Sequence, residues 1–171
     1  LSALDVLVFC EKKDYAGLPA YLLNGINNLT AAGAQYGELT GITAHIVFDE
    51  LSKGSSIPLI SMIDSARDYA VAQGYEKICL LGTLPTMDGT FFQSSFEKSG
   101  ITVITPDEEE KFYIGTKIKT ELELGKVLPD TQRASKEIAE RIIREEQVQA
   151  IVLGCTELPL IFGGVKLPVL Y

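Results

Sequence analysis

The chain has 171 residues, enough for one domain or two small ones with a sizeable core. Its 15 basic and 23 acidic residues give a net charge of −8 with no basic cluster, which argues against binding to nucleic acid or to an anionic membrane. No apolar stretch reaches the roughly 20 residues that a membrane-spanning helix requires, and no signal peptide is visible.

Strand-like apolar runs alternate with segments of helical periodicity along the chain. Strands are expected at 4–10, 37–41, 57–60, 77–81, 101–104, 150–153 and 167–170. Helices are expected at 15–32, 45–51, 65–73, 90–99, 106–124 and 131–146. This alternation predicts an α/β fold with parallel strands joined by right-handed crossovers.

The helix at 106–124 has a strong start signal. Thr105 is expected as its N-cap, with Pro106 at the first helical position and Glu108 completing a capping box. The acidic run at 107–110 would lie on the surface and complement the helix dipole. Gly125 would end the helix.

Residues 41–60 and 154–170 share a pattern: glycine and threonine after a strand, then a helix, then an apolar strand that contains proline. This repeat predicts two related lobes. We expect residues 1–62 in the first lobe, residues 63–150 in the second, and residues 151–171 returning to the first. A cleft between two lobes is a common place for a ligand.

The three cysteines occur without a CxxC pair or a Cys/His cluster, and His45 is the only histidine. An odd number of cysteines without such a cluster argues against a disulfide framework or a metal site, and it favours a reducing, cytoplasmic location. Cys10 and Cys79 lie inside predicted strands and are expected in the core. His45 is more typical of a structural hydrogen-bonding residue than of a catalytic one.

Cys155 is the cysteine with a candidate function. It follows the apolar strand 150–153 and Gly154, so it lies at the carboxyl end of a strand, where open α/β sheets place their ligand sites. A helix beginning near Thr156 would direct its positive end at the sulfur and favour the thiolate. The alternative is a small buried cysteine at a strand end.

Hydroxyl groups follow the predicted strand ends. Thr83 and Thr86 follow the strand 77–81 and precede a helix, so their hydroxyl and N–H groups could converge on an anion. Thr156 could likewise hold a carboxylate. Helix capping is the alternative role for these threonines, and Glu157 fits surface capping as well as catalysis.

The segment Gly154-Cys155-Thr156-Glu157-Leu158-Pro159-Leu160 resembles the aspartate/glutamate racemase superfamily, in particular its aspartate racemase branch. Four further segments agree with it in order along the chain: 43–51, 57–61, 80–87 and 105–109. The resemblance runs from about Ala32 to Tyr171. It implies two Rossmann-like lobes with parallel sheets, an active site in the cleft between them, and a reaction without cofactor or metal.

In this family, two cysteines face the substrate from opposite sides. One removes the α-proton as a thiolate and the other delivers a proton to the far face, because inversion at a carbon needs an acid and a base on opposite sides. The resemblance implies that Cys155 is catalytic. It also implies a pocket for a small carboxylate or amino-acid substrate, lined by Gly41, Thr43, Thr83, Thr86 and Thr156.

The first family cysteine belongs to a Cys-Asn-Thr-x-His motif, which here reads Gly41-Ile42-Thr43-Ala44-His45. Gly41 cannot exchange a proton, so a racemase would need Cys155 and an unidentified partner acid. Arylmalonate decarboxylases resemble this chain in pairing glycine with a single cysteine, since loss of CO2 needs only one proton donor. A third hypothesis is a carboxylate-binding protein that has lost its activity.

The family's N-terminal glycine-rich loop and last helix have no counterpart in this chain. We therefore expect native sequence to continue beyond Leu1 and Tyr171. A homodimer is a further expectation.

Overall fold

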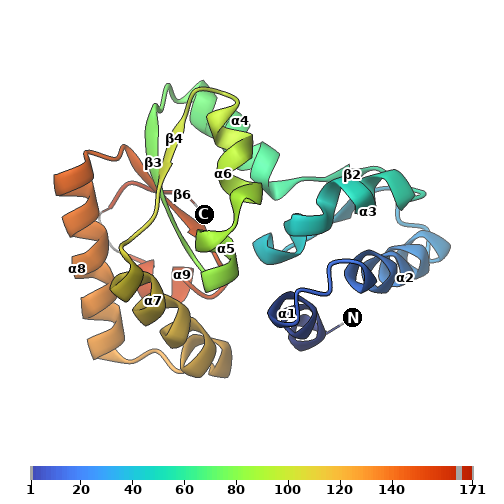
Figure 1. Ribbon diagram of the computed structural model, residues 1–171, viewed down its shortest axis with the longest axis horizontal. Coiled ribbons are helices and arrows are strands. Elements are labelled where there is room, and N and C mark those ends of the chain that lie inside the picture. The colour runs from blue at the N-terminus through green and yellow to red at the C-terminus, as the bar shows by residue number, and fades with distance from the viewer. Residues whose placement is uncertain (1, 165–166, 171) are drawn as a thin grey trace. The chain divides into compact units, whose positions relative to one another are not determined.

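A computed structural model describes residues 2–164 and 167–170 of the chain (Figure 1). The contacts between residues divide the chain into two units, Leu1–Ser65 and Ala66–Tyr171. Each unit has its own parallel sheet, which confirms the expected α/β architecture with parallel strands. Helix α4 (Met62–Ala72) carries the chain from the first unit into the second.

The first unit packs helices against a short pair of strands. Its helices are α1 (Ala3–Glu11), α2 (Gly17–Ala31) and α3 (Phe48–Gly54), with the 3-10 helix η1 (Ile42–Val47) leading directly into α3. Strands β1 (Gly37–Glu38) and β2 (Leu59–Ile60) pair in parallel. The buried apolar residues of this unit are Cys10, Leu18, Leu22, Ile26, Ala44, Val47 and Leu51.

The strand expected at 4–10 is wrong, because these residues form helix α1. Val6 and Phe9 recur at helical spacing and pack against the core of the first unit. Tyr21 of α2 holds this helix: its ring centroid lies 5.5 Å from that of Phe9, and its hydroxyl donates to Asp5 Oδ2 at 2.7 Å. A short apolar run does not distinguish a strand from a buried helix, and packing against α2 decides the outcome here.

The second unit is a four-stranded parallel sheet covered by helices. The strands β3 (Lys77–Gly82), β4 (Thr102–Ile104), β5 (Ala150–Gly154) and β6 (Val169–Leu170) lie in the order β4-β3-β5-β6. The helices between them are α5 (Leu84–Asp88), α6 (Thr90–Glu97), α7 (Glu108–Thr120), the 3-10 helix η2 (Leu122–Leu124), α8 (Pro129–Glu146) and α9 (Pro159–Phe162). Figure 1 shows α7 and α8 on one side of this sheet and α6 on the other.

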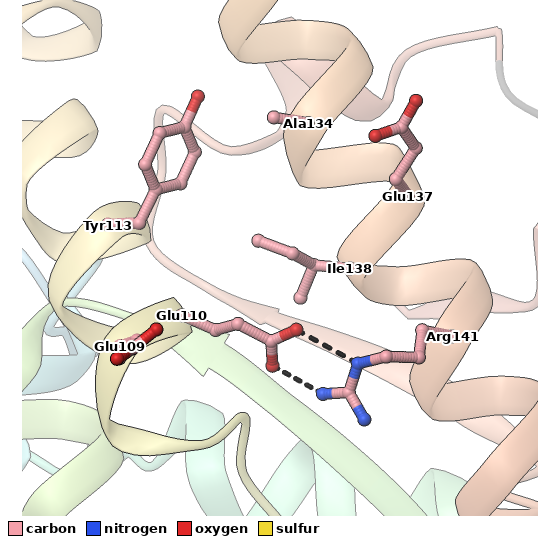
Figure 2. A pocket seen from close by; sticks show the side chains of 7 residues that line it. All are labelled: Glu109, Glu110, Tyr113, Ala134, Glu137, Ile138 and Arg141. Carbon is pink, nitrogen blue, oxygen red and sulfur yellow. Dashed lines mark hydrogen bonds and ion pairs between the residues drawn. The ribbon is translucent and has the colours of Figure 1, made fainter.

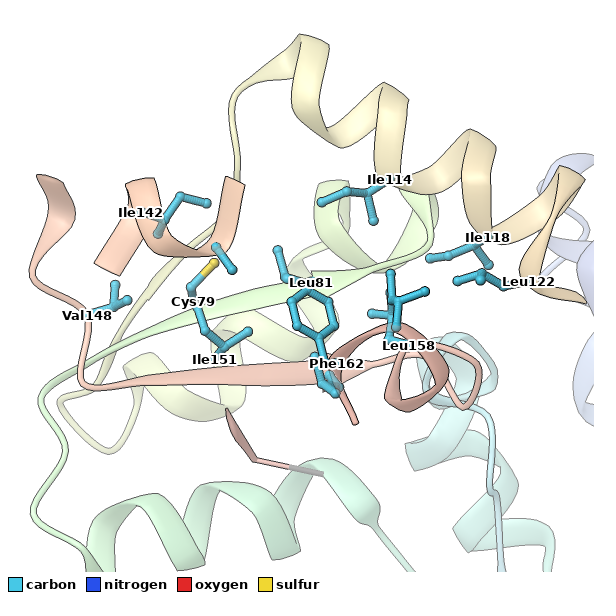
Figure 3. Close-up of a cluster of buried hydrophobic side chains, with 13 residues drawn as sticks. Cys79, Leu81, Ile114, Ile118, Leu122, Ile142, Val148, Ile151, Leu158 and Phe162 are labelled. Carbon is cyan, nitrogen blue, oxygen red and sulfur yellow. The ribbon is translucent and has the colours of Figure 1, made fainter. Parts of the chain in front are cut away.

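Burial on both faces explains the composition of the central strands. Residues 78–81 of β3 are fully buried and apolar, a pattern typical of parallel strands covered on both sides. On one face, residues of β3 and β5 pack with α7, α8 and α9 (Figure 3). This cluster contains Cys79, Leu81, Ile114, Ile118, Leu122, Ala139, Ile142, Val148, Ile151, Leu153, Leu158, Ile161 and Phe162.

Helix α7 starts later than the sequence predicts. The N-cap is Asp107, not Thr105: the Asp107 carboxylate accepts the Glu110 N–H at 2.9 Å, and the Glu110 side chain accepts the Asp107 N–H. Pro106 keeps Thr105 out of the helical conformation, so the next acidic residue takes the capping position. The α-helix also ends earlier than predicted, at Thr120, and the 3-10 helix η2 takes up the remaining residues. Gly125, in the left-handed conformation at φ 70°, ends η2.

The boundary between the units lies at residues 65/66 instead of the expected 62/63. Residues 151–171 are expected to return to the first lobe, but β5 pairs along β3, and β6 pairs with β5. These backbone hydrogen bonds fix the segment in the second sheet; residues 165, 166 and 171 lie outside the described part. Among the helices that the structure describes, none is long and apolar enough to cross a membrane.

Candidate active site

Two central strands of the second unit end side by side, and candidate residues follow both. Gly82 of β3 pairs with Gly154 of β5, so Thr83 and Cys155 come directly after neighbouring strand ends. The chain leaves β3 toward β4 on one side and leaves β5 toward β6 on the other. Ligands of open α/β sheets bind where the strand order reverses in this way, beyond the carboxyl ends of the strands.

Thr86 fills the space between these two strand ends, and its side chain is fully buried. A Cβ atom at Gly82 would stand 3.2 Å from Thr86 Cγ2, and one at Gly154 would stand 3.3 Å from the same methyl group. Glycine at both positions therefore leaves room for this side chain.

The turn into α5 brings two hydroxyls together. The Thr86 N–H donates to the Thr83 carbonyl at 3.0 Å, and the Thr83 and Thr86 hydroxyl oxygens lie 3.0 Å apart. The structure thus joins two of the predicted substrate-binding residues at the end of β3. Thr156, a third, follows the end of the adjacent strand β5.

Cys155, Thr156 and Glu157 form a hydrogen-bonded group. The Cys155 thiol donates to Glu157 Oε2 at 3.0 Å, and the Thr156 hydroxyl donates to the same oxygen at 2.7 Å. Cys155 and Glu157 are half-buried, whereas Thr156 is exposed. Glu157 is therefore a hydrogen-bond partner of the candidate catalytic thiol. From the sequence, a role at the site and surface capping were equally plausible for this residue.

The helix expected near Thr156 is wrong. Residues 155–158 form a turn closed by a hydrogen bond from the Leu158 N–H to the Cys155 carbonyl at 3.1 Å, and α9 starts at Pro159. Proline opens a helix readily, since it lacks the N–H that the first turn leaves unpaired. The short helix thus begins four residues beyond the thiol and is not available to stabilise a thiolate as expected.

The resting form of Cys155 is the thiol. Burial raises the pKa of Cys155 to about 12; the Glu157 backbone N–H opposes this shift, while the carboxylates of Glu157 and Glu123 add to it. The sequence predicts a lowered value, and the expected thiolate is wrong for this resting structure. The influence of Glu123, which lies in η2, leaves no signal in the local sequence around Cys155.

Gly41 and Thr43 belong to the first unit. Gly41 is exposed and has φ −97° and ψ 120°, whereas Thr43 is buried in η1. His45 holds this segment: its Nδ1 lies 3.2 Å from the Gly41 carbonyl, and its Nε2 accepts the Met62 N–H at 3.2 Å. Burial lowers the pKa of His45. The expected structural hydrogen-bonding role of this histidine is confirmed.

The other two cysteines are core residues, as predicted. Cys79 is fully buried in the second unit and Cys10 is buried in the first. Burial raises the pKa of both thiols, that of Cys79 to about 12. Among the described residues, no group of three or more His, Cys, Asp or Glu side chains is placed to hold a metal ion.

A cavity of about 490 Å3 lies elsewhere in the second unit, between α7 and α8 (Figure 2). Its floor includes Ile138 and the ion pair between Glu110 and Arg141, and Figure 2 shows Tyr113 and Glu137 on opposite walls. None of the predicted site residues lines it. The cavity is therefore separate from the strand ends that carry Cys155 and Thr83.

Comparisons with known proteins give a consistent result. Residues 3–170 match the sequence model of a family described as Asp/Glu/hydantoin racemase. A broad specificity amino-acid racemase of Bacillus subtilis, RacX, is 20% identical over 153 residues, covering 90% of this chain and 65% of that protein. The chain thus spans 65% of the length of this curated relative.

Solved structures resemble the chain over most of its length. A candidate Asp/Glu racemase from Yersinia pestis has 29% identity and a TM-score of 0.87, covering 100% of this chain and 75% of that one. An aspartate racemase homologue from Pyrococcus horikoshii has 30% identity and a TM-score of 0.79, covering 94% of this chain and 70% of that one. An arylmalonate decarboxylase, at 11% identity, a TM-score of 0.56, and 92% and 71% coverage, shares the fold alone.

Proposed function

Because the chain belongs to the Asp/Glu/hydantoin racemase family, we propose that it is an amino-acid racemase of the aspartate/glutamate type. Cys155 exchanges the α-proton of the substrate, and no coenzyme or metal takes part. The observation that carries this proposal is the position of Cys155 beside Thr83, beyond paired strand ends where the strand order of the second sheet reverses.

In this proposal the substrate lies beyond the ends of β3 and β5. Thr83 binds a substrate carboxylate with its hydroxyl group, and Thr86 supports Thr83 from below. Thr156 acts through the Glu157 carboxylate that it holds. Gly41 and Thr43 are the proposed substrate-binding residues of the first unit. Such contacts orient the α-carbon toward the sulfur, and holding reacting groups in place is a large part of catalysis.

In this proposal the Cys155 sulfur itself carries the proton to and from the α-carbon. For one enantiomer Cys155 is the base, and its thiolate removes the α-proton: the C–H bond breaks, the S–H bond forms, and the electron pair stays on the substrate. For the other enantiomer Cys155 starts as the thiol and donates a proton. The reverse step returns a proton to the same carbon. Inversion needs an acid on the opposite face, and Gly41 cannot supply one, so a different group, or water, completes the reaction.

A single-cysteine decarboxylase is the second candidate. Loss of CO2 leaves a carbanion-like intermediate that requires one proton donor, and the resting thiol of Cys155 is such a donor. Gly41 fits this alternative, since no acid is needed on the second face. A carboxylate-binding protein without activity is the third candidate.

Exchange of the α-proton tests the proposal. In D2O, the protein should replace the α-hydrogen of aspartate or glutamate with deuterium, followed by 1H NMR. Cys155→Ser should abolish this exchange, because an alcohol is a poor base unless it is activated. Cys10→Ala, which removes a thiol outside the site, is the matched control and should retain exchange.

Two results would overturn the racemase proposal. One is the absence of exchange with both amino acids. The other is exchange that persists in Cys155→Ser. Decarboxylation of an arylmalonate by a protein that shows no exchange would favour the second candidate, and substrate binding without any turnover would favour the third.

A further inference from the structure

The hydrogen bonds around Cys155 assign a role to Glu157, and this assignment rests on the proposed function. We propose that Glu157 is a positioning residue that keeps Cys155 protonated, so that Cys155 begins the reaction as the proton donor. Glu157 is then neither a surface cap nor a general base that activates the thiol.

The geometry fixes one carboxylate oxygen against the sulfur. Glu157 Oε2 accepts the Cys155 S–H at 3.0 Å and the Thr156 O–H at 2.7 Å. Because both donors meet the same oxygen, Thr156 holds the carboxylate in the position where it accepts the hydrogen bond from the thiol. A carboxylate can accept such bonds only as long as the donors keep their protons.

The turn that carries these three residues is firmly anchored. The Leu158 N–H donates to the Cys155 carbonyl at 3.1 Å, and the Leu158 side chain is fully buried. Pro159 then starts α9. The turn therefore fixes the backbone of these residues, and the two hydrogen bonds from Cys155 and Thr156 fix the end of the Glu157 side chain.

Electrostatics act in the same direction as the hydrogen bonds. A thiolate at Cys155 would stand beside the Glu157 carboxylate, and the Glu123 carboxylate of η2 also acts on this sulfur. The one feature that favours the thiolate is the Glu157 backbone N–H. Like charges disfavour ionisation, and burial of the sulfur strengthens this effect.

Cys155 acts as the acid once the α-proton has left the opposite face. There water takes the α-proton, the C–H bond breaks, and its electron pair stays on the substrate carbon. The S–H bond of Cys155 then breaks, its proton bonds to that carbon through the electron pair, and a thiolate remains. The thiolate recovers a proton from water, and the new S–H again donates to Glu157. In a racemase this order applies to the enantiomer whose α-proton is removed on the face opposite Cys155.

Alkylation of Cys155 tests this role without any substrate, so its result is independent of the racemase proposal. The probe is iodoacetamide, which reacts with thiolates, and the rate at Cys155 is followed by peptide mass spectrometry from pH 7 to 10. Glu157→Gln removes the charge and keeps the shape. In this variant, the curve of alkylation rate against pH should shift to lower pH by about one unit. At pH 8 the reaction should therefore be about tenfold faster.

Three variants make the outcome specific. Glu157→Asp retains the charge and should remain slow. Glu97→Gln, which removes an exposed carboxylate from α6 of the same unit, should match the unmodified protein. Glu123→Gln should accelerate alkylation by a smaller factor, and it carries the test if Glu157→Gln does not fold.

The proposal is overturned by an unchanged or slower rate in folded Glu157→Gln. An unchanged rate would make Glu157 a surface residue, and a slower rate would make it the base that activates the thiol. If Glu157→Gln does not fold, an unchanged rate in Glu123→Gln overturns the proposal as well.

Discussion

Gly41 occupies the position where the family motif has its first cysteine, and its surroundings allow the side chain to be restored. Its backbone, at φ −97° and ψ 120°, lies in the extended region open to any residue. In the described part of its own unit, no atom lies within 4 Å of the position that a Cβ would take. We therefore expect Gly41→Cys to change the free energy of unfolding by less than about 1 kcal/mol.

The same substitution should change the chemistry. In a racemase that lacks one proton donor, a thiol at residue 41 supplies an acid on the second face, so the ratio of inversion to deuterium exchange should rise. Chiral chromatography of the products, together with 1H NMR in D2O, measures this ratio. A decarboxylase gains nothing from the added thiol, and an unchanged ratio in a protein that still exchanges would contradict the two-face geometry proposed here.

Strands β3 and β5 and helix α5 meet at Thr86, whose two groups have different tasks. Its methyl group lies against both strand-end glycines, and its hydroxyl lies against that of Thr83. Thr86→Val retains the methyl contact and removes the hydroxyl. We expect the protein to remain folded, with a loss of about 1 kcal/mol for the missing hydrogen bond.

Substrate affinity should also fall in Thr86→Val. The Thr86 side chain is fully buried, so its hydroxyl acts on the substrate through the Thr83 hydroxyl. Loss of that partner, about 1 kcal/mol, should weaken the binding of aspartate or glutamate about fivefold. Isothermal titration calorimetry measures this change. Thr102→Val, in an exposed position of β4, is the matched control, and equal affinity in the two variants would remove Thr86 from the binding site.

The sequence predicts the elements of the second unit well because their signals are local and agree with one another. The apolar run of β5 ends at a glycine, and Gly125 ends the helical segment that α7 and η2 form together. Element starts were harder to predict. Asp107 is the N-cap of α7, and Pro159 is the first residue of α9. Which residue takes such a position depends on the backbone geometry as well as on residue type.

The ionisation of Cys155 could not be derived from its place in the chain. A strand end followed by a helix suggests a thiolate, but burial and the Glu157 and Glu123 carboxylates give the opposite result. Both the burial of the sulfur and its distance from these carboxylates depend on the tertiary packing around it, which the local sequence does not reveal. The predicted position of the thiol at the end of β5, by contrast, follows directly from the apolar strand before it.

At the scale of the whole molecule, the two segments that repeat in the sequence, 41–60 and 154–170, have similar local structures. β1, η1 with α3, and β2 form a parallel pair in the first unit, and β5, α9 and β6 form one in the second. The repeat seen in the sequence therefore corresponds to a repeated local structure. The two units nevertheless differ in how they depend on ionisable groups, and this difference predicts how each responds to acid.

In the first unit, the sensitive group is His45. Its pKa is lowered by burial, so it contributes to stability above its unfolded value of about 6.5, and that contribution is lost as the pH falls through the lower folded value. Protonation of Nε2 also removes the acceptor for the Met62 N–H.

In the second unit, Lys117 and Thr131 lower the pKa of Glu121, and Arg141 and Arg144 lower that of Glu145. Carboxylates of this kind contribute to stability above about pH 4.3, and they lose that contribution only as the pH falls through their lowered values. Their loss therefore begins at a lower pH than that of His45.

We accordingly expect the first unit to lose protection before the second when the pH falls from 7.5 to 5. Amide hydrogen exchange, corrected for the intrinsic effect of pH, resolves the two units, and residues 17–31 of α2 should exchange faster at pH 5 while residues 77–82 of β3 remain protected. His45→Gln places an uncharged acceptor beside the Met62 N–H and should abolish the change in α2. Equal loss in both units, or a loss in α2 that persists in His45→Gln, would show that another group controls the acid response of the first unit.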